Sequence, residues 1–272
     1  MDYLADTHKM SLRAGCRALS LSRSVYHYQP DSTRDEPVIQ ALLALVERYP
    51  RYGFHKLFVI LRREGHPWNH KRVHRVYCQL KLNMRRKGKK RLPKRHPEPL
   101  VVPEQINQCW SIDFMSDALW CGRRFRTFNV VDDHNREALY IDIDLNLPAT
   151  RVIRTLDRIA AWRGSPRKLR MDNGPELVSV ALAGWAEQHH VQLEFIQPGK
   201  PTQNSYIERF NRTYREEILD FYIFRTLNEV REVTDRWLTE YNEERPHESL
   251  GDLTPVAYRQ RKEPGASNFD WP

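Results

Sequence analysis

Several features that define other classes of protein are missing from this chain. It has no run of eighteen apolar residues, so the sequence predicts no membrane-spanning helix. Its first residues lack the apolar segment of a secretory signal. Its four cysteines are scattered and form no Cys-x-x-Cys pair, which is typical of a reducing compartment. We therefore expect a cytoplasmic protein without a membrane partner.

Acidic residues are almost absent from one stretch of the chain. Between residues 51 and 96 there are sixteen Lys or Arg and one acid, Glu64. This stretch contributes +15 to a net charge of +9, so the remainder of the chain is net acidic. Aromatic and helical sequence lies just upstream of its densest part, which favours a nucleic-acid-binding module over a solvated linker. The candidate DNA-binding residues of this dense part are Arg85, Arg86, Lys87, Lys89 and Lys90.

The first third of the chain has helical patterns. Residues 11–28 predict two short helices joined by a turn near Ser20, and three further helices are expected at 37–48, 56–65 and 70–80. The last of these places apolar residues inward and Lys71, Arg72 and Arg75 outward. A helix, a short turn and a basic helix form the arrangement that places a recognition helix in the major groove of DNA.

A second interpretation of the same basic helix is a zinc site. His70, His74 and Cys78 fall at successive i+4 positions on one helical face. A structural zinc site needs four ligands, usually with a second close pair, and no such pair follows at a plausible distance. The sequence therefore favours a basic helix face over a zinc site.

Short strands replace the helices after a Pro-rich stretch. The alternation of apolar residues predicts strands at 109–115, 123–134, 137–145, 167–171 and 191–197. Helices are expected after the third, fourth and fifth strands, with Pro175 starting the second of them, and a long amphipathic helix follows near 227–241. We predict five parts: a short helix-turn-helix-like segment (1–34), a basic helix-turn-helix-like DNA-binding domain (35–90), a Pro-rich basic linker (91–104), an α/β core (105–222) and a C-terminal helical extension (223–272).

Three acids occupy positions that local structure explains only in part. Asp113 lies in an otherwise apolar strand, where an unpaired carboxylate is costly, although pairing with an Arg is an alternative. Asp172 ends a strand just before a turn, so a turn or helix-capping role is its alternative. Glu208 lies at the margin of an apolar helix stripe, where a surface pair with Arg212 is the alternative. The remaining acids near strands, Asp132, Asp133, Asp142 and Asp144, are interpreted as structural.

The order of the strands suggests a common location for the three acids. If the first strand is central and the fourth pairs beside it, Asp113 and Asp172 come close together. The helix after the fifth strand then presents Glu208 to the same point. Three carboxylates around one point repel each other unless a divalent cation lies between them. Oxygen ligands of this kind suit Mg²⁺, and two such ions can drive an in-line phosphoryl displacement.

The segments around these acids resemble a known family. WSIDF around Asp113, MDNGPE around Asp172 and QPGKPTQNSYIERFNR around Glu208 are similar to the DDE catalytic core of retroviral-integrase-like transposases. Thirty-five residues separate Asp172 from Glu208, the spacing for which that group is known, and Arg215 matches its basic residue seven positions later. The tail YNEERPHESLGDLTPVAY resembles the end of these proteins. The nearest resemblance is to the second-frame (OrfB) product of the bacterial insertion-sequence-3 family.

This resemblance implies a fold, an activity and a site. The fold is RNase H-like: a mixed five-stranded sheet flanked by helices, with the first three strands antiparallel, preceded here by all-α helix-turn-helix-like modules. The activity is cleavage and strand transfer at the ends of a bacterial insertion sequence, with Asp113, Asp172 and Glu208 as ligands of Mg²⁺ or Mn²⁺, two ions being expected. Transposon-end DNA is expected near Lys200, Arg212 and Arg215.

Partners and rival functions complete the expectation. The partners implied are terminal and target DNA, further copies of the chain, and a first-frame (OrfA) product, because no leucine zipper is visible here. One alternative is a non-catalytic DNA-binding regulator or decayed relative. Another is an RNase H-like nuclease that cuts without joining.

Overall fold

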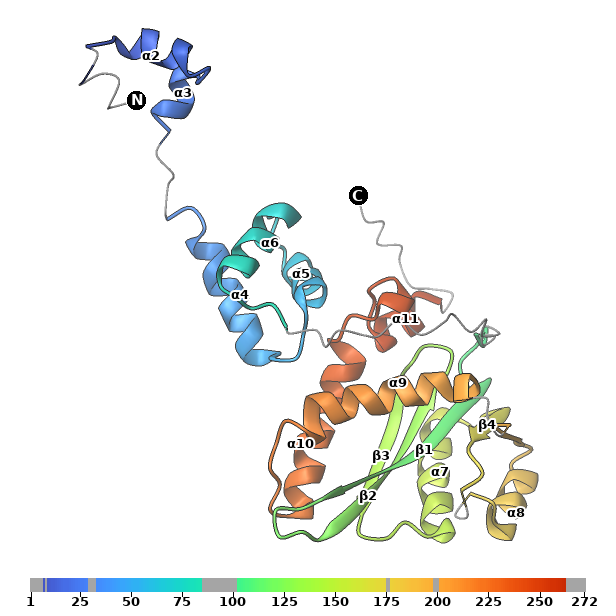
Figure 1. Cartoon of the computed structure of the whole chain (residues 1–272). Coiled ribbons are helices and arrows are strands. Elements are labelled where there is room, and N and C mark those ends of the chain that lie inside the picture. Colours follow the sequence, from blue (N-terminus) through green and yellow to red (C-terminus); the bar gives the residue numbers. More distant parts are fainter. Residues whose placement is uncertain are drawn as a thin grey trace. The chain divides into compact units, whose positions relative to one another are not determined.

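The computed structural model describes residues 7, 9–28, 33–84, 102–174, 177–197 and 201–262 (Figure 1). The chain forms two compact units, each treated separately below. The first unit comprises Met1–Pro50 and Gly65–Met84, and the second comprises Arg51–Glu64 and Arg85–Pro272. No helix in the described part of the chain is long and apolar enough to cross a membrane.

The first unit is helical, as predicted. Its elements are α2 (Leu12–Ala18), α3 (Arg23–Tyr26), α4 (Glu36–Arg48) and α6 (His70–Gln79). Side chains cap three of these helices in the usual way, because Ser11, Ser22 and Asn69 each accept a backbone N–H of the first turn. The α4 and α6 helices pack through fully buried residues, which include Val38, Leu42, Val73 and Val76.

The second unit is built on the predicted mixed sheet of five strands. These are β1 (Cys109–Ala118), β2 (Arg124–Asp132), β3 (Ala138–Asp144), β4 (Lys168–Met171) and β5 (Gln192–Phe195). The spatial order is β3-β2-β1-β4-β5, so β1 is central. The β1–β2 and β2–β3 pairs are antiparallel, whereas β1–β4 and β4–β5 are parallel. This arrangement is the RNase H-like sheet, and the prediction of the fold class is confirmed.

Helices cover both faces of this sheet (Figure 1). On one face, α7 (Ala149–Arg163) and α8 (Val180–Gln188) pack on alternate β1 side chains, among them Trp110 and Ile112. On the other face, α9 (Ser205–Tyr214) and α10 (Leu227–Glu243) pack on Met115 and Phe125. Burying two faces explains why β1 and β2 are apolar along most of their length. The unit also contains α5 (Phe54–Arg63), α11 (Pro255–Lys262) and three short helical turns, η1 (Pro201–Asn204), η2 (Arg215–Leu219) and η3 (Glu248–Leu250).

One helix begins later than the sequence predicts. The α8 helix starts at Val180, and its N-cap is Ser179, whose hydroxyl accepts the N–H of Leu182 at 3.2 Å. Before it, the Gly174 carbonyl accepts the N–H groups of Leu177 and Val178, which closes a separate turn. Pro175, expected to start the helix, lies outside the described residues, as do most of the Pro-rich stretch and residues 85–90.

Candidate active site

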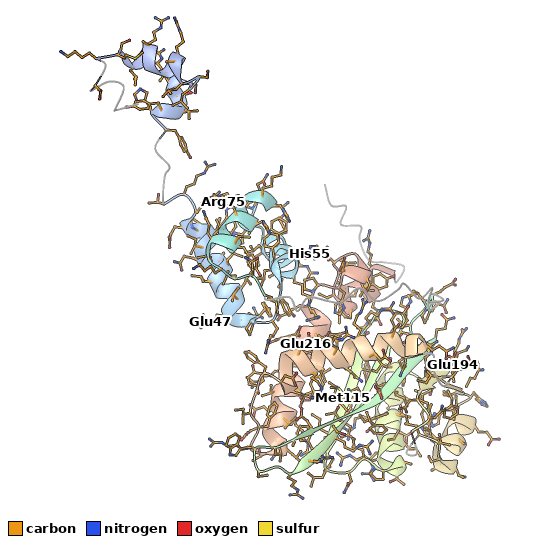
Figure 2. All side chains as sticks on the ribbon, in the orientation of Figure 1. Glu47, His55, Arg75, Met115, Glu194 and Glu216 are labelled. Carbon is orange, nitrogen blue, oxygen red and sulfur yellow. The ribbon has the colours of Figure 1, made fainter. Side chains whose placement is uncertain are left out.

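The central strand β1 carries the first of the three acids. Because side chains alternate along a strand, Trp110 and Ile112 enter the core under α7, while Asp113 shares the opposite face with Ser111 and Met115. Met115 is labelled in Figure 2. This second face is the one that α9 covers. Asp113 is partly buried there, and one of its carboxylate oxygens accepts the N–H of Phe114 at 2.8 Å.

Two buried asparagines hold the other oxygen of Asp113. The amide nitrogen of Asn211 on α9 donates to Asp113 Oδ2 at 2.8 Å. The amide nitrogen of Asn129 on β2 donates in turn to Asn211 Oδ1 at 2.7 Å. Asn129 is the residue paired with Asp113 in the β1–β2 register, so all three side chains meet on one face of the sheet. This relay was not predicted from the sequence, although Asn211 follows Glu208 by one helical turn and lies within the apolar stripe.

Asp172 directly follows β4, the strand beside β1. In the parallel register Ser111 lies opposite Arg170, and continuing that register by two residues places Asp113 opposite Asp172. Asp172 Oδ1 accepts the N–H of Gly174 at 3.0 Å, so the turn role weighed from the sequence is also present. The following residue, Asn173, donates to the carbonyl of Ile196 at 3.2 Å and fixes this loop to the end of β5.

Glu208 lies in the first turn of α9, exposed at the margin of the buried stripe. Burial and the negative charges of Asp172 and Glu208 together raise the pKa of Asp113 to about 6, with burial as the largest cause. The hydrogen bonds from Phe114 and Asn211 oppose these effects. The structure therefore brings the three acids into electrostatic contact around Asp113.

The three carboxylates do not form a closed coordination shell in this conformation. Within the described ranges, no group of three His, Cys, Asp or Glu side chains is arranged to hold one metal ion. The donor set nevertheless fits a hard divalent cation, because it offers only oxygen atoms whose charges repel one another.

The basic residues predicted near the site have different environments. Arg212 is exposed and has no hydrogen-bond or ion-pair partner among the described side chains, Glu208 included. Arg215, at the start of η2, contacts the end of β1: it lies 3.1 Å from Asp117 Oδ2 and donates to the Ser116 carbonyl at 2.9 Å. Lys200 lies outside the described residues.

The basic residues predicted on α6 also have different environments. Lys71 is exposed, whereas Arg72 and Arg75 both bind the carboxylate of Asp35 at the N-terminus of α4, at 2.9 and 2.7 Å. These two ion pairs lower the pKa of Asp35. On the neighbouring face, the Cys78 sulfur lies 3.8 Å from His74 Nε2. Arg85, Arg86, Lys87, Lys89 and Lys90 lie outside the described residues.

The acids interpreted as structural each have an arginine partner. Arg151 on α7 binds both Asp142 and Asp144 of β3. The Asp133 carboxylate accepts hydrogen bonds from Arg170 Nη1 at 2.8 Å and from the Ser111 hydroxyl at 2.6 Å. The other contact of Arg170 is Glu194 on the edge strand β5, at 3.3 Å (Figure 2).

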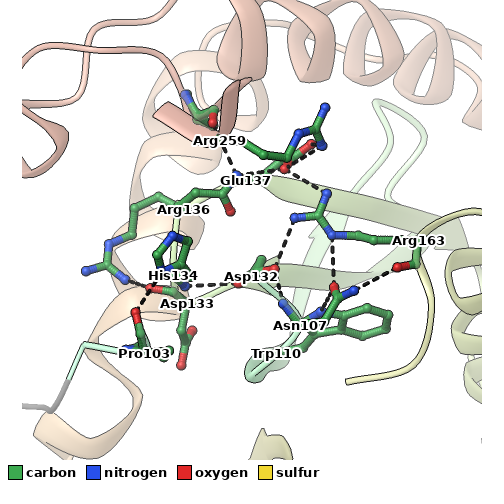
Figure 3. Close-up of polar contacts among 12 residues, drawn as sticks. Pro103, Asn107, Trp110, Asp132, Asp133, His134, Arg136, Glu137, Arg163 and Arg259 are labelled. Carbon is green, nitrogen blue, oxygen red and sulfur yellow. Dashed lines mark hydrogen bonds and ion pairs between the residues drawn. The ribbon is translucent and has the colours of Figure 1, made fainter. Parts of the chain in front are cut away.

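Asp132 belongs to a buried network at the end of β2 (Figure 3). Arg163, the last residue of α7, donates to Asp132 at 3.0 Å and pairs with Glu137 at 2.8 Å. Arg259 of α11 binds Glu137 from the other side at 2.7 Å. The network therefore joins α7, the β2–β3 turn and the C-terminal helix, and no pattern in the sequence predicts these partners.

Comparisons with known proteins agree with this architecture. Two models described as "Integrase core domain" match residues 103–201 and 189–255, and one described as "HTH-like domain" matches residues 33–90. The 31.7 kDa protein of insertion element IS407 from Burkholderia multivorans is 42% identical over 259 residues, which is 95% of this chain and 94% of that protein. The 39.2 kDa protein of insertion element IS476 from Xanthomonas euvesicatoria is 38% identical over 92% of this chain and 72% of its own length.

Two more distant similarities are also found. InsK of insertion sequence element IS150 from Escherichia coli (strain K12), which carries a transposase name, is 24% identical over 90% of this chain and 92% of its own. Among solved structures, a chain of the simian T-cell lymphotropic virus intasome aligns over 84% of this chain and 78% of that one, with 15% identity and a TM-score of 0.48. The sequence matches and the topology of the sheet lead to one conclusion: the chain belongs to the insertion-sequence-3 family of transposases, of the second-frame (OrfB) type with an integrase-like core.

Proposed function

We propose that this insertion-element protein is a DNA transposase that cleaves the ends of its element and joins them to target DNA with the help of divalent metal ions. The observation that carries the proposal is the electrostatic interaction of Asp113, in the middle of β1, with Asp172, which follows the neighbouring strand β4, and with Glu208 in the helix α9, which packs on β1. A partly buried acid beside two like charges destabilises the folded state, and groups of this kind concentrate at functional sites.

Asp113, Asp172 and Glu208 would hold Mg²⁺ or Mn²⁺, and we propose two ions. When bound, such ions supply activation of the attacking oxygen and stabilisation of the departing 3′-oxygen. The chain's own residues orient the site: Asn211 fixes one oxygen of Asp113, and the Phe114 N–H fixes the other. No Ser, Cys or Tyr nucleophile is required by this scheme.

DNA contacts are proposed for the exposed basic residues. Arg212 lies one turn beyond Glu208 on α9 and is free to meet a phosphate. Lys71 is exposed on α6, within the HTH-like match. Arg72 and Arg75, whose side chains are paired with Asp35, and Arg215, which contacts the end of β1, are also proposed DNA contacts. Lys200 and the basic residues at 85–90 remain proposed phosphate contacts.

The assembly is also a proposal. Joining two transposon ends requires several copies of the chain, and a first-frame product is a candidate partner. Bacterial DNA lies in the cytoplasm, so this role places the protein there. The five-part division of the chain, with the core at 105–222, is retained as the working definition of its domains.

A strand-joining assay tests this function. Labelled duplexes copied from the DNA that flanks the gene are incubated with plasmid and Mg²⁺ or Mn²⁺, and wild type is compared with Glu208→Gln. Glu216→Gln is the matched control, because Glu216 is an exposed acid eight residues further along the same helical segment (Figure 2). We expect joining that requires metal, is lost in Glu208→Gln and persists in Glu216→Gln.

Other outcomes would favour the rival functions. Nicking without joining would indicate an RNase H-like nuclease. DNA binding without any metal-dependent strand chemistry, in wild type as in the variant, would indicate a non-catalytic regulator.

A further inference from the structure

An exposed aromatic and basic surface lies at the hairpin between β1 and β2. Trp120, at the tip of this hairpin, is 74% exposed. It follows Asp113 by seven residues, which corresponds to roughly 20 Å of extended strand. Trp120 is therefore separate from the site of the three acids and from the buried cores.

The loop between η2 and α10 extends this surface. The backbone N–H of Trp120 donates to the Phe224 carbonyl at 2.7 Å, so the loop lies directly beside the hairpin. Phe224 is buried in the core under α9 and anchors the loop, whereas Tyr222 and Ile223 are 46% and 73% exposed. The rings of Tyr222 and Phe224 are 6.0 Å apart. We call the exposed set the hairpin patch: Trp120, Tyr222, Ile223, Arg123, Arg124 and Arg225.

The charge of the hairpin patch has one sign. Residues 118–125 and 221–226 contain three arginines and no acid. All three arginines are exposed, and none of their guanidinium groups has a partner in the described part of the chain. Three acids border the patch: Asp117 and Asp220 both face Arg215, at 3.1 and 3.6 Å, and the Glu229 carboxylate accepts the backbone N–H of Arg225 at 2.8 Å. The patch is therefore complementary to a polyanion.

The chemistry of the patch selects among polyanions and partners. Exposed aromatic rings beside arginines match single strands, whose bases stack on the rings while the phosphates meet the guanidinium groups. Duplex DNA hides its base faces within the stack, so it leaves the rings unused. A second copy of the chain would bring the same unpaired arginines face to face, which is repulsive.

We propose that the hairpin patch binds a single-stranded segment of DNA. Trp120 and Tyr222 stack on unpaired bases, and Arg123, Arg124 and Arg225 contact the flanking phosphates. This binding site is separate from the three acids and goes beyond the proposed strand chemistry. It requires no metal, so its test is independent of whether cleavage and joining occur.

Site-resolved photo-cross-linking of the full chain tests the proposal. A single-stranded thymidine 12-mer with one 5-iododeoxyuridine is irradiated with the protein in EDTA, and the cross-linked peptides are identified by mass spectrometry. We expect adducts on Trp120 or Tyr222, whatever other adducts form in the basic N-terminal region. Adducts confined to other parts of the chain would overturn the proposal.

Variants supply the controls. In Trp120→Ala the yield at Tyr222 should fall at least about five-fold, because stacking on one base is lost. Trp162→Ala is the matched control, since Trp162 is 57% exposed but lies on α7, and it should leave the yield unchanged. Arg124→Ala should weaken the salt dependence of the cross-link, whereas the exposed α7 residue Arg154 should not when changed to Ala. Unchanged yield in Trp120→Ala, or an altered oligomeric state in place of altered cross-linking, would refute single-strand binding.

Discussion

Asp113 is partly buried beside two like charges. This arrangement destabilises the metal-free fold but provides the charge that binds a metal ion. Asp113→Asn removes the repulsion from Asp172 and Glu208 and keeps the shape of the side chain. In EDTA at pH 7.5, we expect the variant to melt several degrees above wild type. In millimolar Mn²⁺ wild type should gain stability, by about 2.7 kcal/mol at a hundred-fold excess over Kd, and the variant should gain little. Thermal melts with and without metal measure this, and equal melting shifts in the two proteins would contradict the ligand role.

Asn211 acts on metal binding through the orientation of Asp113. Asn211→Ala removes a hydrogen bond to a carboxylate, a contact that contributes about 1.5–3 kcal/mol. We expect Mn²⁺ affinity, measured by calorimetry, to fall about ten-fold or more. Asn129→Ala should have a smaller effect, because Asn129 contacts only Asn211 in this relay. An equal loss in both variants, or no loss in Asn211→Ala, would mean that the relay is purely structural.

His247 gives the second unit a predictable pH dependence. Burial lowers the pKa of His247 from its ordinary value of 6.5 to about 3, and the charges of Arg245, Lys56 and Arg136 act in the same direction. The folded state therefore favours the neutral ring, so its contribution to stability is complete above pH 6.5 and is lost as the pH falls below that value. Between pH 6.5 and pH 5 the loss is about 2 kcal/mol.

The variant that tests this effect is His247→Gln. We expect denaturant unfolding to show a smaller loss of stability between pH 6.5 and pH 5 in the variant than in wild type. The difference between the two proteins is the relevant quantity, because other groups titrate in both. Parallel pH profiles would show that His247 is accessible to protons in the folded state.

At the scale of the elements, the pair of Asp133 and Arg170 connects β4 to the turn after β2. Both side chains are buried, and Asp133 also accepts the Ser111 hydroxyl. Arg170→Met leaves a buried carboxylate without its cation, which costs about 3–5 kcal/mol. We expect the melting temperature to fall by about 10 °C. Arg167→Met, at an exposed arginine three residues earlier, should change it little. Adding Asp133→Asn to Arg170→Met should restore part of the loss.

The elements themselves could be predicted because period and composition determine them. The alternation around Asp113 identified a strand, and the central position assumed for that strand is the one that it occupies in the sheet. The start of α8 was wrong by about five residues, because Ser179 caps a helix that Pro175 was expected to open. The partners of buried polar groups were beyond prediction. Asn129 and Asn211 are 82 residues apart in the chain, and only the packed fold shows that their side chains meet.

At the scale of the whole molecule, the segment 51–64 belongs to the same compact unit as the integrase-like core, although the HTH-like match includes it. Arg63 on α5 donates to the carbonyls of Glu244 and Asp252, and His55 lies 2.9 Å from the Asp252 carboxylate. The guanidinium group of Arg245 lies over the Tyr52 ring, with its central carbon 5.2 Å from the ring centroid. The five-part division of the chain remains a prediction, but these contacts indicate that a boundary near residue 90 does not separate two independent folding units.

Fragments test this cooperativity. A fragment of residues 102–272 keeps the sheet and all its helices but loses Tyr52, His55 and Arg63, whereas a fragment of residues 51–272 retains them. Without that segment, water reaches the buried pair of Arg245 and Glu217, and the C-terminal turn loses its anchor on α5. We expect 102–272 to melt about 5 °C or more below 51–272, which corresponds to roughly 2 kcal/mol for a domain of this size. Calorimetry of the two fragments decides the point, because identical melting temperatures would show that the segment packs on the core without stabilising it.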